Sequence, residues 1–210
     1  MPRDRGIRSF SRAPRCCFRG SALNLPNLLT LSRIGLSLLL PFLLLAPGLG
    51  TKAAALAVFV AAALTDWWDG RIARRRGLVS KFGVMMDPIA DKVLVLAAFF
   101  AFAKTRVAPA WMVVLIATRE LLITGLRMIA LARGKTLPAE AAGKVKAAAQ
   151  MVTISVTLIY LITARLLPAE NVGVSYGLAA VRGMMGVTVL LTITSGASFL
   201  WHNRKQIFGS

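Results

Sequence analysis

Apolar and polar positions alternate along this chain in long blocks rather than residue by residue. After residue 22, six apolar stretches are separated by short polar segments. A transmembrane helix needs about 20 mostly apolar residues, with a range of roughly 17–25. Leu28–Leu45, which is broken only by Arg33, Ala147–Ala164 and Gly183–Trp201 fall in this range. We predict that each of these three stretches is a membrane-spanning helix.

The other three apolar stretches carry charges at their ends or inside them. They are Ala53–Leu64, Val93–Ala103 and Trp111–Ala132. They become full spans only if these charges lie inside the helices. An ionisable group within a membrane costs about 2.5–3.5 kcal/mol on insertion scales, and such groups point to function. The pattern therefore predicts an all-α integral membrane bundle of six transmembrane helices, with a polar cavity that holds the charges.

Composition excludes two other classes of protein. The chain of 210 residues is 57% hydrophobic and 16% charged, whereas soluble domains have about 45–50% apolar and about 25% charged residues. A soluble enzyme of this size could not bury so much apolar surface. A disordered chain would lack these apolar residues. A membrane protein is the class that remains.

The strongly basic charge fits a membrane protein with cytoplasmic loops. There are 26 Lys and Arg residues against eight Asp and Glu residues, which gives a net charge of +18. These cations lie mainly between apolar runs, so we expect them to contact anionic lipids and not nucleic acid. With both termini in the cytoplasm, 17 Lys and Arg residues fall on cytoplasmic segments and five on external ones, Arg182 among the five. The positive-inside rule therefore places both termini in the cytoplasm.

Residues 1–22 form a basic leader ahead of the domain predicted for residues 23–210. The leader has six Arg residues and no apolar run, which excludes a secretory signal peptide. It fits a cytoplasmic segment on anionic lipid, as in a bacterial cell membrane, or a transit peptide for an organellar inner membrane. The adjacent Cys16 and Cys17 indicate no disulfide framework, although palmitoylation stays open.

Four of the eight acidic residues lie in one 26-residue window, at Asp66, Asp69, Asp87 and Asp91. Spacings of three and four residues place each pair on one helix face. Two antiparallel helices joined by a short loop can point all four carboxylates at each other. By charge, two divalent cations would neutralise them, and hard oxygen ligands favour Mg²⁺ or Mn²⁺. The alternative is that neighbouring cations pair with these carboxylates, namely Arg71, Arg74–Arg76 and Lys92.

The segment between the two acidic pairs suits a diphosphate. Gly70 leaves the backbone open to a close ligand, Arg74 follows one turn later, and Ser80 adds a hydroxyl in the loop. Carboxylates for two metals beside an arginine are typical of phosphoryl transfer, in which metals stabilise the attacking and leaving oxygens.

The full pattern resembles the signature of the CDP-alcohol phosphatidyltransferase family. Eight fixed positions carry this resemblance: Asp66, Asp69, Gly70, Ala73, Arg74, Gly83, Asp87 and Asp91. It implies a six-helix membrane enzyme that transfers a phosphate-linked group from a CDP-linked donor and releases CMP. It also implies two divalent cations, Mg²⁺ or Mn²⁺, in a cavity open to the cytoplasm, and a homodimer.

Flanking segments are similar to those family members that join CDP-diacylglycerol to sn-glycerol 3-phosphate. The similar segments are residues 24–33, 65–70, 82–92, 118–120 with 125–127, and 143–151. We therefore expect phosphatidylglycerophosphate and CMP as products. By resemblance, Asp66, Asp69 and Asp87 would bind the metals, and Asp91 would be both a metal ligand and the general base. A role for Asp91 as a metal ligand alone stays open.

The resemblance also assigns candidate substrate-binding residues. For CDP-diacylglycerol these are Asn27, Thr30, Arg33, Gly70, Arg74 and Ser80. The phosphate of the acceptor requires cations, and the candidates are Arg119, Arg127 and Lys144, with Lys146 beside them. Three structural alternatives stay open: Arg119 paired with Glu120, Lys144 and Lys146 as ordinary cytoplasmic anchors, and Arg33 as a cation that reaches the interface.

Three rival functions remain at this point. The same chemistry could use another acceptor, such as inositol phosphate, phosphatidylglycerol or serine. A cation transporter could bind its ion with buried carboxylates, but the sequence has no inverted repeat. A scaffold without activity is disfavoured because four unused aspartates in a membrane are costly.

Overall fold

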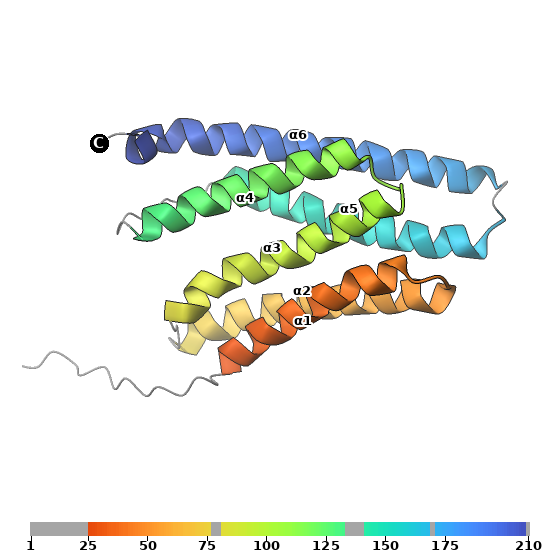
Figure 1. Ribbon diagram of the computed structural model, residues 1–210, viewed down its shortest axis with the longest axis horizontal. Coiled ribbons are helices and arrows are strands. Elements are labelled where there is room, and N and C mark those ends of the chain that lie inside the picture. Colours follow the sequence, from red (N-terminus) through yellow and green to blue (C-terminus); the bar gives the residue numbers. More distant parts are fainter. Residues whose placement is uncertain (1–24, 77–80, 133–140, 169–170, 209–210) are drawn as a thin grey trace, which may run out of the picture.

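The computed structural model describes residues 25–76, 81–132, 141–168 and 171–208 (Figure 1). The predicted leader, Cys16, Cys17 and Ser80 lie outside these ranges. Within them the chain forms six α-helices and no strand, which confirms the all-α prediction for this part of the chain. The helices are α1 (Leu25–Leu45), α2 (Leu49–Arg76), α3 (Lys81–Lys104), α4 (Ala110–Ala132), α5 (Ala141–Leu166) and α6 (Val172–Phe208).

The charges that interrupt the apolar pattern lie inside helices. Asp66 and Asp69 belong to α2, Asp87 and Asp91 belong to α3, and Glu120 belongs to α4. A charged side chain does not end a helix, because the backbone hydrogen bonds form within the helix whatever the side chain. The condition for six long helices, that they include the charges, is therefore met.

Helix α6 begins well before the apolar stretch that predicted it. Arg182, which we placed in an external segment, lies inside α6, so the helix continues beyond the predicted span on that side. The predicted apolar stretch began just after the charged Arg182. The helix instead begins after Asn171, whose side-chain oxygen accepts a hydrogen bond from the Gly173 backbone N–H at 2.8 Å. Asn171 thus satisfies a free donor at the helix start. At 37 residues, α6 is about 55 Å long.

Short turns join α1 to α2 and α3 to α4 at one end of the bundle (Figure 1). In the first turn, Gly48 has a φ of +117°, which glycine adopts without strain. The buried Lys52 ammonium donates to the carbonyl oxygens of Leu44 and Ala46. These carbonyls end α1 and lack helical partners, so Lys52 fixes α2 to the end of α1.

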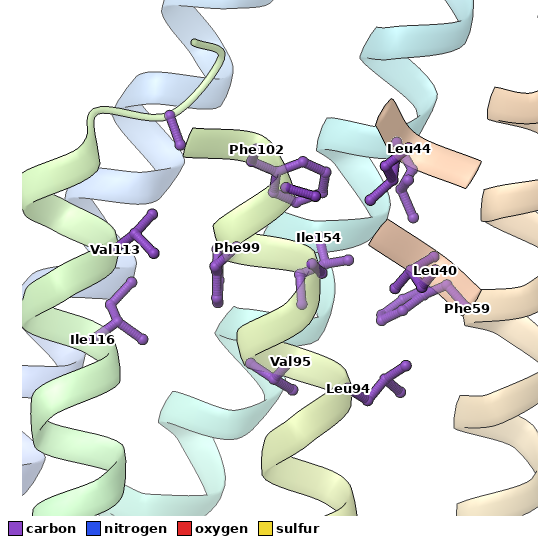
Figure 2. Packing of buried hydrophobic residues seen from close by; sticks show 14 of the residues in the cluster. Leu40, Leu44, Phe59, Leu94, Val95, Phe99, Phe102, Val113, Ile116 and Ile154 are labelled. Carbon is purple, nitrogen blue, oxygen red and sulfur yellow. The ribbon is translucent and has the colours of Figure 1, made fainter. Parts of the chain in front are cut away.

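Helix α3 lies in the middle of the bundle and packs against α1, α4 and α5. Figure 2 shows Phe99 and Phe102 of α3 between Leu40 and Leu44 on one side and Val113 and Ile116 on the other. The two phenylalanine rings meet edge to face, with centroids 6.3 Å apart. This apolar core therefore fixes the position of α3, the helix that carries half of the acidic motif.

The outer surface of the bundle is apolar, whereas several polar side chains are buried. Exposed residues include Phe42, Leu121 and Leu190, while Thr153 and Thr188 are buried and hydrogen-bonded to each other at 2.8 Å. A soluble protein rarely exposes so many large apolar side chains. Two segments, Gly143–Leu166 and Val172–Arg204, are long and apolar enough to cross a membrane. These features support a membrane protein.

The helices alternate in direction, so their ends separate into two groups (Figure 1). The start of α1, the ends of α2 and α4, the starts of α3 and α5 and the end of α6 lie at the same end of the bundle. This end, which we call the motif end, is where the acidic motif is located.

Candidate active site

The acidic motif is divided between two consecutive helices at the motif end. Asp66 and Asp69 lie in the part of α2 that precedes its end at Arg76, and Asp87 and Asp91 lie in the first half of α3. The helical spacing places each pair on one face of its own helix, as predicted. Gly70 and Arg74 follow in α2, between the two acidic pairs.

The side chains of these motif residues lie outside the described part of the chain, as do those of Asn27 and Thr30 in α1. Among the residues whose side chains are described, no group of three or more His, Cys, Asp or Glu could hold a metal. The predicted metal ligands are not in that set, so their role stays a prediction. Arg33 is described, and it is buried in α1 at 3% exposure. Its guanidinium therefore does not extend to the surface of the bundle.

Beside the motif, a buried carboxylate joins three helices. Glu120 of α4 is 1% exposed. Its Oε2 lies 2.8 Å from the Lys92 ammonium of α3, and its Oε1 accepts from the Lys146 ammonium of α5. The Gln150 amide of α5 also donates to Oε1, at 3.1 Å. Lys92 follows Asp91 directly in α3, so this carboxylate contacts the residue next to the predicted general base.

Arg119 extends these contacts to a fourth helix. Its Nη1 lies 3.5 Å from Glu120 Oε1, and its Nη2 donates to Ser195 Oγ of α6 at 2.9 Å. A Cβ atom on Gly196 would lie 3.0 Å from Arg119 Nε, so the absence of a side chain there lets Arg119 lie close to α6. We call the group formed by Lys92, Arg119, Glu120, Lys146, Gln150 and Ser195 the Glu120 cluster.

The charges within the Glu120 cluster do not balance among its described members. Three cations, Lys92, Arg119 and Lys146, face one carboxylate, which gives a formal charge of +2. Lys146 is 3% exposed, so its charge is removed from water as fully as that of Glu120. A buried charge requires a partner, and two of these three positive charges exceed what Glu120 can neutralise. Among the described residues, the cluster therefore carries more positive than negative charge.

The predicted acceptor-phosphate residues differ in their surroundings. Arg119 belongs to the Glu120 cluster, in agreement with the open alternative that it pairs with Glu120. Arg127 lies over the Phe199 ring, with its Cζ 5.5 Å from the ring centroid. Lys144 is exposed near the start of α5. Arg127 is close enough to Arg119 for their charges to interact, whereas the described contacts do not join Lys144 to Arg119. The phosphate-binding role of all three stays a prediction.

Sequence reasoning named Arg119, Glu120 and Lys146, but it did not join them into one cluster with α3 and α6. It treated Lys92 only as a partner for the aspartates, and it did not consider Gln150 or Ser195. One feature of the sequence could have revealed part of it, because Lys146 and Gln150 are four residues apart and therefore share a helix face. The contacts of α3 and α6 with α4 depend on tertiary packing, so no local pattern indicates them.

The described part of the chain is an all-helical bundle with an apolar surface and charged side chains in its interior. These features are typical of membrane proteins that have a buried polar site. The sequence model of the CDP-alcohol phosphatidyltransferase family matches residues 23–195, which include the whole acidic motif. The chain belongs to this family. Its members are enzymes that generally depend on divalent metals.

Curated relatives cover nearly the whole chain. A CDP-diacylglycerol–glycerol-3-phosphate 3-phosphatidyltransferase of Bacillus subtilis (strain 168) is 36% identical over 196 residues, which are 88% of this chain and 97% of the relative. The enzyme of the same name in Escherichia coli (strain K12) is 37% identical over 193 residues, 88% of this chain and 97% of the relative. A probable phosphatidylglycerophosphate synthase of Mycobacterium tuberculosis (strain H37Rv) is 35% identical over 197 residues, 91% of this chain and 87% of the relative.

Proposed function

We propose that this protein transfers a phosphatidyl group from CDP-diacylglycerol to sn-glycerol 3-phosphate and releases CMP. One observation carries the proposal: all eight motif residues are present, on two consecutive helices whose joined ends lie at the motif end. The relatives named for this reaction support the choice of substrates, because each is at least 34% identical over most of this chain.

In this reaction, Asp91 accepts the proton of the acceptor hydroxyl. The resulting oxygen attacks the phosphorus that carries the diacylglycerol. A bond forms between this oxygen and the phosphorus, and the bond from the phosphorus to the CMP oxygen breaks. The electron pair of the broken bond leaves with CMP. Asp91 suits this role because α3 is held by the apolar core, which limits its movement during the step.

The motif fits two divalent cations by the chemistry of its donors. Asp66, Asp69, Asp87 and Asp91 offer only carboxylate oxygens, which suit Mg²⁺ or Mn²⁺. Their four negative charges equal the charge of two such ions. When bound, the ions would offset the negative charge of the diphosphate and of the attacking and leaving oxygens. Asp66, Asp69 and Asp87 would act only as ligands.

The substrates would bind on two sides of Asp91. We assign the CDP part of the donor to Asn27, Thr30 and Arg33 of α1, to Gly70 and Arg74 of α2, and to Ser80. The acceptor phosphate would contact Arg119, Arg127 and Lys144. Arg33 is buried inside the bundle, and its positive charge suits the diphosphate of the donor.

We further propose that all six helices span the membrane, with the motif end in the cytoplasm of a bacterial cell and with the protein as a homodimer. The basic residues before α1, at the end of α2 and after α4 support this orientation. Cysteine accessibility at the two ends of the bundle, in intact cells, would test the orientation.

The reaction can be tested with the purified protein in detergent, CDP-diacylglycerol and Mg²⁺. CMP release is measured with sn-glycerol 3-phosphate, inositol phosphate, serine or phosphatidylglycerol as the acceptor. We expect release with sn-glycerol 3-phosphate and formation of phosphatidylglycerophosphate. Release only with another acceptor would refute the proposed substrate but keep the chemistry. No release with any of them would refute the proposed reaction.

A further inference from the structure

We propose that Glu120 is a positioning residue that holds Lys92, Arg119 and Lys146 together, so that these three cations take the phosphate of the acceptor. This inference rests on the proposed function. It adds Lys92 and Lys146 to the acceptor site and gives the buried carboxylate a role in substrate recognition.

The first argument is geometric. Long cationic side chains from α3, α4 and α5 would repel each other and separate if nothing held them. Glu120 prevents this because all three cations contact its carboxylate. Lys92 contacts Oε2, and Lys146 and Arg119 contact Oε1. At 1% exposure, the carboxylate cannot turn toward water and release them.

The second argument concerns the donors that remain for a ligand. An ammonium group carries three N–H donors, and Glu120 takes one from each lysine in the described contacts. Lys92 is 22% exposed and Arg119 is 15% exposed, so an anion can reach the cluster from the side of these two residues. The buried Lys146 then contributes its positive charge from the interior side of the cluster.

The third argument is the balance of charge. In the proposed enzyme, the four aspartates would hold two divalent ions, and their negative charge would then not be available to offset the Glu120 cluster. The charge of +2 within the cluster is therefore left for the substrate. A phosphate monoester carries about −1.5 to −2 at pH 7. The acceptor phosphate thus matches the cluster in charge.

The fourth argument is location. Lys92 is the residue after Asp91 in α3, so the cluster begins next to the proposed base. In sn-glycerol 3-phosphate, three carbons connect the reacting hydroxyl to the phosphate. A phosphate held by the cluster would therefore leave this hydroxyl near the turn of α3 that carries Asp91. A phosphate-free acceptor would gain nothing from these cations.

The test compares steady-state kinetics of wild type and Glu120→Gln in detergent with saturating Mg²⁺. This substitution makes the cluster more positive, so charge alone would strengthen phosphate binding. A positioning role predicts the opposite, because the cations are no longer held. We expect the acceptor KM to rise about tenfold or more, equivalent to ~1.4 kcal/mol, while the donor KM stays within about twofold. Isothermal titration with sn-glycerol 3-phosphate should show the same loss of affinity.

A second substitution keeps the proposal testable if Glu120→Gln does not fold. Lys92→Gln removes the most exposed cation of the cluster and should raise the acceptor KM to a similar extent, whereas Lys92→Arg should restore most of the affinity. Lys52→Met is the matched control, because it removes another buried cation at the opposite end of the bundle. It should lower thermal stability and leave the acceptor KM unchanged.

The outcomes separate this inference from the proposed function. If the wild type uses sn-glycerol 3-phosphate and Glu120→Gln keeps or lowers the acceptor KM, the role of Glu120 is wrong and the proposed function stands. If Glu120→Gln does not fold, an unchanged acceptor KM in Lys92→Gln overturns the inference in the same way. If the wild type uses only a phosphate-free acceptor, both proposals fail.

Discussion

Removal of Glu120 and removal of Lys146 should have very different effects on stability, although the two residues contact each other. Glu120→Leu leaves three cations without their carboxylate, and Lys146 among them is only 3% exposed. Lys146→Met replaces a buried cation with an apolar side chain of similar length. Glu120 then still contacts Lys92 at 2.8 Å and Gln150 at 3.1 Å. The first change leaves a buried charge uncompensated, and the second does not.

The size of the difference follows from the cost of a buried charge. Loss of one partner of a buried ion pair costs about 3–5 kcal/mol when the other charge stays behind. For a protein of this size, 1 kcal/mol corresponds to about 2–4 °C in Tm. We therefore expect Glu120→Leu to lower Tm by roughly 6–20 °C. Lys146→Met should change stability by about 1 kcal/mol or less, which is roughly 4 °C at most.

Thermal unfolding of the detergent-solubilised protein can measure this difference, with the loss of helical circular dichroism as the readout. The double variant Glu120→Leu with Lys146→Met should recover part of the loss, because it removes the most deeply buried uncompensated cation. Equal shifts for the two single variants, or a larger shift for Lys146→Met, would refute the charge argument. The cluster would then act through packing alone.

Three further predictions concern the chemistry. Excess EDTA should abolish CMP release and added Mg²⁺ or Mn²⁺ should restore it, whereas full turnover in EDTA would exclude the metal proposal. Asp91→Asn should abolish turnover but keep CDP-diacylglycerol binding; a variant with more than about a tenth of the wild-type rate has lost less than ~1.4 kcal/mol, so Asp91 would not be the base. Lys144→Ala should raise the acceptor KM, since a hydrogen bond to a charged group contributes about 1.5–3 kcal/mol, while Arg74→Ala should raise the donor KM. Kinetics with each substrate varied in turn would measure both effects. A rise in the donor KM for Lys144→Ala together with a rise in the acceptor KM for Arg74→Ala would contradict the two assignments.

Local sequence patterns were enough to predict the class of fold and the location of the motif. Blocks of apolar residues predicted six helices, and the acidic spacing placed each carboxylate pair on one helix face. Both results depend on local rules: the length of an apolar run and the number of residues in a helical turn. The same rules did not locate the start of α6, because an apolar run does not define where a helix begins. The Asn171 cap does.

Which charged residues share a site depends on how the helices pack against each other. In the sequence, Glu120 has Arg119 as its neighbour, and a local ion pair was one reading of the two. In the folded chain, Lys92 of α3 and Lys146 of α5 also reach Glu120, and Ser195 of α6 reaches Arg119. These contacts exist because the apolar core sets α3 between α1, α4 and α5. Helix packing depends on side-chain shapes across the whole core, so a local pattern cannot specify it.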